Sequence, residues 1–170
     1  MDDVANFAEV IASASVVVGL VFAAVQLRQF RRVQEREAGL ELLHSYQTPV
    51  LAQALLLVFS LPDNLSKAEV EARAGDGIAA LYTLLTTWES LGILVYRGQV
   101  ELAMVDDFFS GPILLSWRKL RRYVEEQRAE QGRETIEEWF QWLAERMLER
   151  ESRTPPVPAH IEHRGWTPPK

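Results

Sequence analysis

The chain of 170 residues contains no cysteine and only three histidines: His44, His160 and His163. The lack of cysteine excludes disulfides, thiolate metal sites and cysteine nucleophiles. The sequence also lacks the phosphate-binding motifs G-x-x-x-x-G-K-[ST] and G-x-G-x-x-G and the zinc-protease motif H-E-x-x-H. These absences exclude several common classes of enzyme, and we expect no cofactor and no metal.

The sequence has neither an excess of positive charge nor a strand-like pattern. Its net charge is −6, which disfavours general nucleic-acid binding. No stretch alternates apolar and polar residues for long enough to indicate a half-buried strand. We therefore expect an all-α fold: a single-pass transmembrane helix that extends into a cytoplasmic helical bundle.

The most informative feature is a run of 18 residues, positions 10–27, without any charged side chain. As a helix it would be roughly 27 Å long, close to the hydrocarbon thickness of about 30 Å. Acidic residues precede the run and four arginines follow it: Arg28, Arg31, Arg32 and Arg36. A membrane-spanning helix is the interpretation that fits best.

The four arginines predict the orientation, because cationic flanks stay in the cytoplasm. We expect the N-terminus outside the inner membrane of a bacterium, with residues 28–170 in the cytoplasm. The arginines could bind lipid headgroups, or they could mark topology only. A cleaved signal and the buried helix of a soluble protein are the alternatives. The acidic N-terminal flank argues against the signal.

The pattern divides the chain into three parts. Residues 1–46 form the transmembrane and juxtamembrane helix, residues 47–152 a cytoplasmic helical domain, and residues 153–170 a proline-rich tail that is expected to be disordered alone. Within the domain, Thr48-Pro49 predicts a helix start before an apolar run that is either a core helix or lies at the membrane surface. Ser66-x-x-Glu69 and Thr135-x-x-Glu138 predict capping boxes, and Gly111-Pro112 predicts a helix break.

Apolar residues at helical spacing predict the core of this domain. The first stripe comprises Ile78, Leu81, Leu85, Trp88, Gly92 and Val95. The second comprises Ile113, Trp117, Leu120 and Val124, and the third Ile136, Trp139, Phe140, Leu143 and Met147. Between Val100 and Phe109 we expect a short helix that turns Leu102, Val105, Phe108 and Phe109 inward.

Small residues in the predicted span suggest self-association. Ser15, Gly19 and Ala23 are four residues apart, and such a row lets two helices approach closely in lipid. The same side continues through Gln26 to His44 as a heptad seam. These residues predict a helix–helix interface, and in a larger ring Gln26 could line a pore.

Polar groups in the domain have both structural and functional interpretations. Glu89 lies in an apolar helix and needs a partner if it is buried. We expect a structural ion pair with Arg118, Arg121 or Arg122, although a catalytic carboxylate is the alternative. The same arginines could contact the inner leaflet or form a solvated face with Glu125, Glu126 and Glu130. A metal at His160-x-x-His163 lacks further ligands, so we expect none there.

Several short motifs resemble an uncharacterised bacterial family. They are Trp88-Glu89-x-Leu91-Gly92, Gly98, Phe108-Phe109, Trp117, Tyr123 and Phe140-x-x-Leu143-Ala144, and the resemblance covers about residues 8–148. It implies one N-terminal transmembrane helix followed by a helical cytoplasmic region. Because the family has no known function, it implies no catalytic residue.

The expected function is that of a membrane-anchored, self-assembling scaffold or small accessory subunit of an inner-membrane complex. The expected partners are membrane lipid, further copies of the chain and a second membrane protein. A homo-oligomeric pore lined by the N-terminal helix is the alternative. An enzyme is not expected, because no nucleophile–base pair is visible in the sequence.

Overall fold

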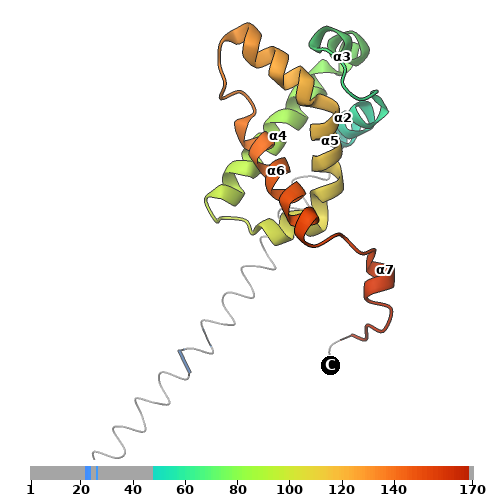
Figure 1. Cartoon of the computed structure of the whole chain (residues 1–170), viewed down its shortest axis with the longest axis vertical. Helices are drawn as coiled ribbons and strands as arrows, with labels where there is room; N and C mark the ends of the chain where they lie inside the picture. The colour runs from blue at the N-terminus through green and yellow to red at the C-terminus, as the bar shows by residue number, and fades with distance from the viewer. Residues whose placement is uncertain (1–21, 24–25, 27–47, 169–170) are drawn as a thin grey trace, which may run out of the picture. The chain divides into compact units, whose positions relative to one another are not determined.

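A computed structural model describes residues 22, 23, 26 and 48–168 of the chain (Figure 1). The chain divides into two compact units, Met1–Ser45 and Tyr46–Lys170. In the first unit, Phe22, Ala23 and Gln26 are helical and exposed. The rest of the predicted span lies outside the described residues, and so does the predicted juxtamembrane helix.

The second unit is built from helices, with no strand among residues 48–168. In chain order they are α2 (Pro49–Ser60), α3 (Lys67–Ala74), the short 3-10 helix η1 (Gly75–Gly77), α4 (Ile78–Tyr96), α5 (Leu102–Gln131), α6 (Glu138–Arg153) and α7 (Ala159–Glu162). The predicted all-α class is confirmed.

Local sequence signals fix several helix ends. The Thr48 hydroxyl accepts a hydrogen bond from the Leu51 N–H at 3.2 Å, and Pro49 occupies the first turn of α2. Ser66 and Glu69 form the predicted capping box at the start of α3. The short helix η1 follows α3 directly, and the break after α4 contains Gly98 with a φ of 67°.

The core lies where α4 and α5 each pack against α2 and α6, and Figure 1 shows α4 and α6 side by side. Most members of the three predicted stripes are fully buried: Leu81, Leu85, Trp88, Ile113, Leu120, Val124, Phe140, Leu143 and Met147. Burial of one large apolar side chain contributes about 1.5–3 kcal/mol, so this cluster is the main source of stability in the domain.

The predicted helix break at Gly111-Pro112 is wrong, because α5 is one continuous helix of 30 residues with Pro112 in its interior. An interior proline costs about 3 kcal/mol through its missing N–H and its ring clash. Val105 before it and Ile113 after it are both fully buried on the core side. Their packing offsets that cost. Phe108, predicted to turn inward, is instead 46% exposed.

One helical stretch, Lys67–Tyr96, is long and apolar enough to cross a membrane, judged by length and composition among the described residues. This stretch combines α3, η1 and α4, and it is not the predicted span at residues 10–27. Packing accounts for its apolar character, since Leu84 and Leu91 of α4 are fully buried among the neighbouring helices. A core helix of this kind passes the same test as a membrane span.

The tail after α6 contains one short helix, α7, which Figure 1 shows away from the helices of the bundle. Every described residue from 152 to 168 is exposed. Three large apolar side chains are among them: Val157, Ile161 and Trp166. The tail therefore adds little to the core.

Candidate functional site

The first candidate site is the junction at which α4 holds the start of α6. One carboxylate oxygen of Glu89 accepts hydrogen bonds from the Trp139 N–H at 2.9 Å and the Phe140 N–H at 2.8 Å. These are the second and third residues of α6, whose free N–H groups an N-cap residue normally satisfies. Glu89 thus caps α6 from a distance of about fifty residues in sequence.

This arrangement corrects two predictions from sequence. The Thr135-x-x-Glu138 capping box is wrong, because the Thr135 hydroxyl accepts from Arg133 Nε and Glu137 precedes the helix without a side-chain cap. The ion pair of Glu89 with Arg118, Arg121 or Arg122 is also wrong. The physical reason is that free N–H groups and the positive end of a helix dipole stabilise a carboxylate without a cation in contact.

Gly92 brings the two helices into close contact. A Cβ atom at this position would lie 2.3 Å from the Trp139 carbonyl oxygen and 2.8 Å from its carbon. Only glycine allows the α6 backbone to approach this surface of α4. The motif Trp88-Glu89-x-Leu91-Gly92 therefore has a structural role. Trp88 is buried in the core, Glu89 caps α6, and Gly92 leaves room for the α6 backbone.

Arg128 of α5 forms hydrogen bonds with the turn that leads into α6. Its guanidinium donates to the Ile136 carbonyl at 2.7 Å, the Glu137 carbonyl at 3.2 Å and the Gln141 side chain at 2.7 Å. Three donors from one planar group fix the path of the chain on both sides of the helix start. Together with Glu89 and Gly92, this residue defines the position of α6.

Two carboxyl groups at this junction have raised pKa values. Burial raises the pKa of Glu137 to about 7, and the neighbouring Glu89 adds to the effect while Arg128 opposes it. Burial also raises the pKa of Glu89 above its ordinary value, although the two N–H groups of α6 favour its charged form. One Glu137 oxygen is buried with no hydrogen-bond partner among the described residues, and the Glu137 φ is 52°.

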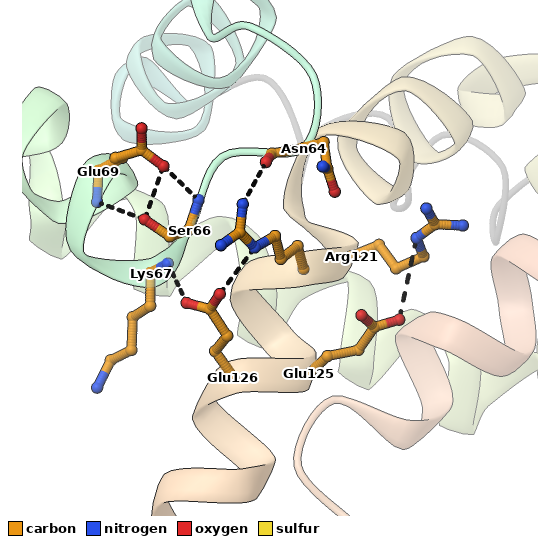
Figure 2. Close-up of polar contacts among 8 residues, drawn as sticks. Asn64, Ser66, Lys67, Glu69, Arg121, Glu125 and Glu126 are labelled. Atoms are coloured by element: carbon orange, nitrogen blue, oxygen red, sulfur yellow. Dashed lines mark hydrogen bonds and ion pairs between the residues drawn. The ribbon is translucent and has the colours of Figure 1, made fainter.

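The second candidate site is the charged face of α5, which holds the loop between α2 and α3 (Figure 2). Arg122 donates to the Asn64 carbonyl at 3.0 Å and to Glu126 at 2.8 Å. The other Glu126 oxygen accepts from the Lys67 N–H at the start of α3, at 2.7 Å. Glu126 thereby adds a cap from α5 to the one that Ser66 supplies, and these contacts hold its pKa below the ordinary value.

The remaining basic residues of this face also have partners on the protein. Arg118 Nε lies 3.3 Å from Asp63 and Lys119 Nζ lies 2.5 Å from the same carboxylate. Arg121 and Glu125 are 3.9 Å apart along the helix. These ion pairs confirm in part the prediction that acidic residues of α5 balance the arginines on a solvated face. Asp63 of the loop is a further acidic partner that was not predicted. Lys67 Nζ pairs with Glu130.

Three aromatic rings gather where α4 ends against α6. The Tyr96 ring centre lies 4.6 Å from that of Trp139 and 5.9 Å from that of Trp142. The Arg146 guanidinium lies 6.0 Å from the Trp142 ring centre. Because Tyr96 is 62% exposed, this cluster forms an aromatic surface above the junction.

A groove of about 880 Å³ lies between the start of α5, the end of α6 and the tail. Two ion pairs line it: Arg150 Nε lies 2.8 Å from Asp106, and Arg146 lies 2.8 Å from Glu149. No group of three histidine or acidic residues in the described part of the chain is arranged to hold a metal. His163 lies 3.9 Å from Glu162 in the exposed tail.

The predicted membrane residues can be located only in part. Ala23 and Gln26 are helical and exposed. The other predicted interface residues, Ser15 and Gly19, lie outside the described residues. So do the predicted headgroup contacts Arg28, Arg31, Arg32 and Arg36.

Sequence reasoning missed Arg128, Glu137 and Asp63. Arg128 is a charged residue four positions after the buried Val124, on the core side of its helix. This position could have identified Arg128 from the sequence, because a long charged side chain on an apolar stripe needs a polar partner.

Comparison with known proteins identifies a family. A family described as a domain of unknown function, DUF4760, matches residues 13–147. No curated protein and no solved structure matches the chain. The match includes both candidate sites and most of the charge-free run. Since it covers well over half of the sequence, the chain belongs to the DUF4760 family.

Proposed function

We propose that the chain is a membrane-anchored, self-assembling scaffold or small accessory subunit of an inner-membrane complex, without a catalytic role. The N-terminal run at residues 10–27 would span the bilayer, with Arg28 and the arginines after it toward the cytoplasmic headgroups. The helical domain would present binding surfaces on that side.

This proposal rests on one observation: three buried or partly buried charged side chains of the domain form hydrogen bonds between its helices. Glu89 caps α6, Arg128 fastens the turn before it, and Glu126 caps α3. A residue committed to such contacts is poorly placed for proton transfer or nucleophilic attack, which need a group free to reach a substrate. The charges therefore support a rigid scaffold.

The anchoring part of the proposal is tested by membrane fractionation of the full chain. We expect the protein to stay in the membrane pellet after a wash at alkaline pH and high salt. A variant with Val17→Arg and Val18→Arg should be released, because each arginine at the centre of a span costs about 2.5–3.5 kcal/mol on insertion scales. Release of the unmodified chain by the wash would contradict the proposal.

The assembly part is tested by the mass of the detergent-solubilised protein. We expect a mass of two or more copies, and an affinity-tagged copy should recover an untagged one. Recovery of a second membrane protein in fixed ratio would favour the accessory-subunit version. A strict monomer at all protein concentrations would contradict self-assembly.

A further inference from the structure

The turn between α5 and α6 holds a carboxyl group in an unfavourable position. One oxygen of Glu137 is buried with no hydrogen-bond partner among the described residues. Burial disfavours the charged form of a carboxyl group, and hydrogen-bond donors that would favour it are missing at this oxygen. Glu137 therefore occupies this position at lower cost when it carries a proton than when it is ionised.

The backbone at Glu137 is strained as well. Its φ of 52° lies in the left-handed region, which side chains other than those of asparagine and aspartate rarely adopt. Strained residues persist only where the surrounding structure holds them, and they are common in segments that switch between two conformations. Glu137 directly precedes α6 and its side chain does not cap the helix, so no local hydrogen bond of that kind offsets the strain.

Contacts from two other helices hold this turn in place. Glu89 of α4 accepts hydrogen bonds from the Trp139 and Phe140 N–H groups, and Arg128 of α5 donates to the Glu137 carbonyl. Because α6 has no side-chain cap from the residue before it, its first turn depends on these distant contacts. A change of charge beside Glu89 would act directly on them.

Charged and titratable groups face Glu137 from both neighbouring helices. They are Glu89 from α4, and Arg128 and Tyr123 from α5. On α6 itself, Glu138 adds a further negative charge near Glu89. Burial and Glu89 raise the pKa of Glu137 to about 7, although Arg128 opposes them. Ionisation near neutral pH thus places a second negative charge beside the Glu89 carboxylate.

We propose that the start of α6 is a pH-sensitive switch. With a proton on Glu137, the first turn of α6 stays bound to Glu89. Ionisation of Glu137 shifts the equilibrium toward a form in which this side chain has turned out to water and the first turn has left Glu89. The opening is confined to that turn, because the fully buried Leu143 and Met147 keep the following turns in the core. The switch needs neither a membrane nor a second copy of the chain.

Trp139 connects the switch to the aromatic surface of the domain. Its N–H is bound by Glu89, its carbonyl lies against Gly92, and its ring centre lies 4.6 Å from that of Tyr96. Movement of the first turn would therefore separate the Trp139 ring from Tyr96. The domain would present a different aromatic surface more often above neutral pH than below it.

Amide hydrogen exchange of the full-length chain in a non-ionic detergent tests the switch, with rates corrected for the intrinsic effect of pH. If opening returns Glu137 to its ordinary pKa of 4.5, protection of the Trp139 and Phe140 amides should fall about tenfold between pH 6 and pH 8. Glu137→Gln should abolish this fall. Glu134→Gln, which changes an exposed residue of the same turn, should retain it.

Urea distinguishes a local opening from unfolding of the whole domain, because the effect of urea scales with the surface that becomes exposed. Low concentrations of urea should leave the protection of Trp139 and Phe140 unchanged and lower that of Leu120, which is buried in α5. An equal response of all three amides would show global unfolding and overturn the switch. So would the absence of a pH effect in the natural chain, or a fall of the same size in Glu137→Gln.

Discussion

Glu89 and Phe140 are 51 residues apart in sequence, yet the carboxylate of the first accepts the backbone N–H of the second at 2.8 Å. This contact joins the middle of α4 to the first turn of α6. It shows that the start of α6 depends on tertiary structure, because the residue before this helix, Glu137, provides no side-chain cap. The domain should therefore form α6 only once α4 is in place.

Removing this distant cap should destabilise the domain. We expect Glu89→Ala to lower the free energy of unfolding by about 2 kcal/mol, the upper part of the range for helix caps. Ser90→Ala, an exposed neighbour on the same helix, should change it by less than about 0.5 kcal/mol. Thermal and urea unfolding of the detergent-solubilised chain, followed by circular dichroism, provides the measurement. Equal stability of the two variants would contradict the capping role.

Two glycines provide a matched pair for the close approach of α4 and α6. We expect Gly92→Ala to cost about 1–3 kcal/mol, because its methyl group would meet the Trp139 backbone at 2.3 Å. Gly111→Ala in α5 has nothing within 4 Å and should stabilise the protein by up to about 1 kcal/mol through helix propensity. The two variants should thus shift the unfolding midpoint in opposite directions. If both variants shifted the unfolding midpoint in the same direction, the clash expected for Gly92→Ala would be relieved by movement of the helices.

Local signals in the sequence predicted much of the helical framework. Thr48-Pro49 and the Ser66–Glu69 box gave correct helix starts, because these caps involve residues three positions apart. The stripe through Ile113, Trp117 and Leu120 gave the buried side of α5 correctly. In each case a local pattern and the tertiary structure require the same residue.

The errors arose where a distant contact outweighed a local signal. Gly111-Pro112 is a strong helix breaker, but buried residues on both sides keep α5 continuous. The Thr135 box was a plausible cap, but Glu89 supplies the same hydrogen bonds from another helix. A sequence alone cannot reveal which side chain arrives from fifty residues away, and the partners of Glu89 could not be predicted for this reason.

Glu126 should control α3 without affecting α6. Glu126→Ala removes the acceptor for the Lys67 N–H and for Arg122. We therefore expect faster amide hydrogen exchange in α3 and unchanged exchange in α6. Glu125→Ala is the matched control, since Glu125 has only a 3.9 Å contact with Arg121 on its own helix. Faster exchange throughout the domain would show that the effect is global and would contradict this division.

Glu137 should make stability depend on pH. Its pKa is about 7 in the folded chain, against 4.5 as the ordinary value. Between these values the folded state binds more protons than the unfolded state, so stability falls as pH rises through this window and levels off above about pH 7. The groups that face Glu137 are Glu89 from α4 and Arg128 from α5.

The Glu137→Gln variant isolates this contribution from the other titrating groups. It should melt on the order of 4 °C above the natural chain at pH 8 and match it at pH 4.5, because an amide cannot acquire the unfavourable buried charge. Glu134→Gln changes an exposed residue of the same turn and should melt like the natural chain at each pH. Melting curves from pH 4.5 to 8.5 in one detergent provide the comparison. If Glu137→Gln and the natural chain keep the same difference at every pH, Glu137 is not the titrating group.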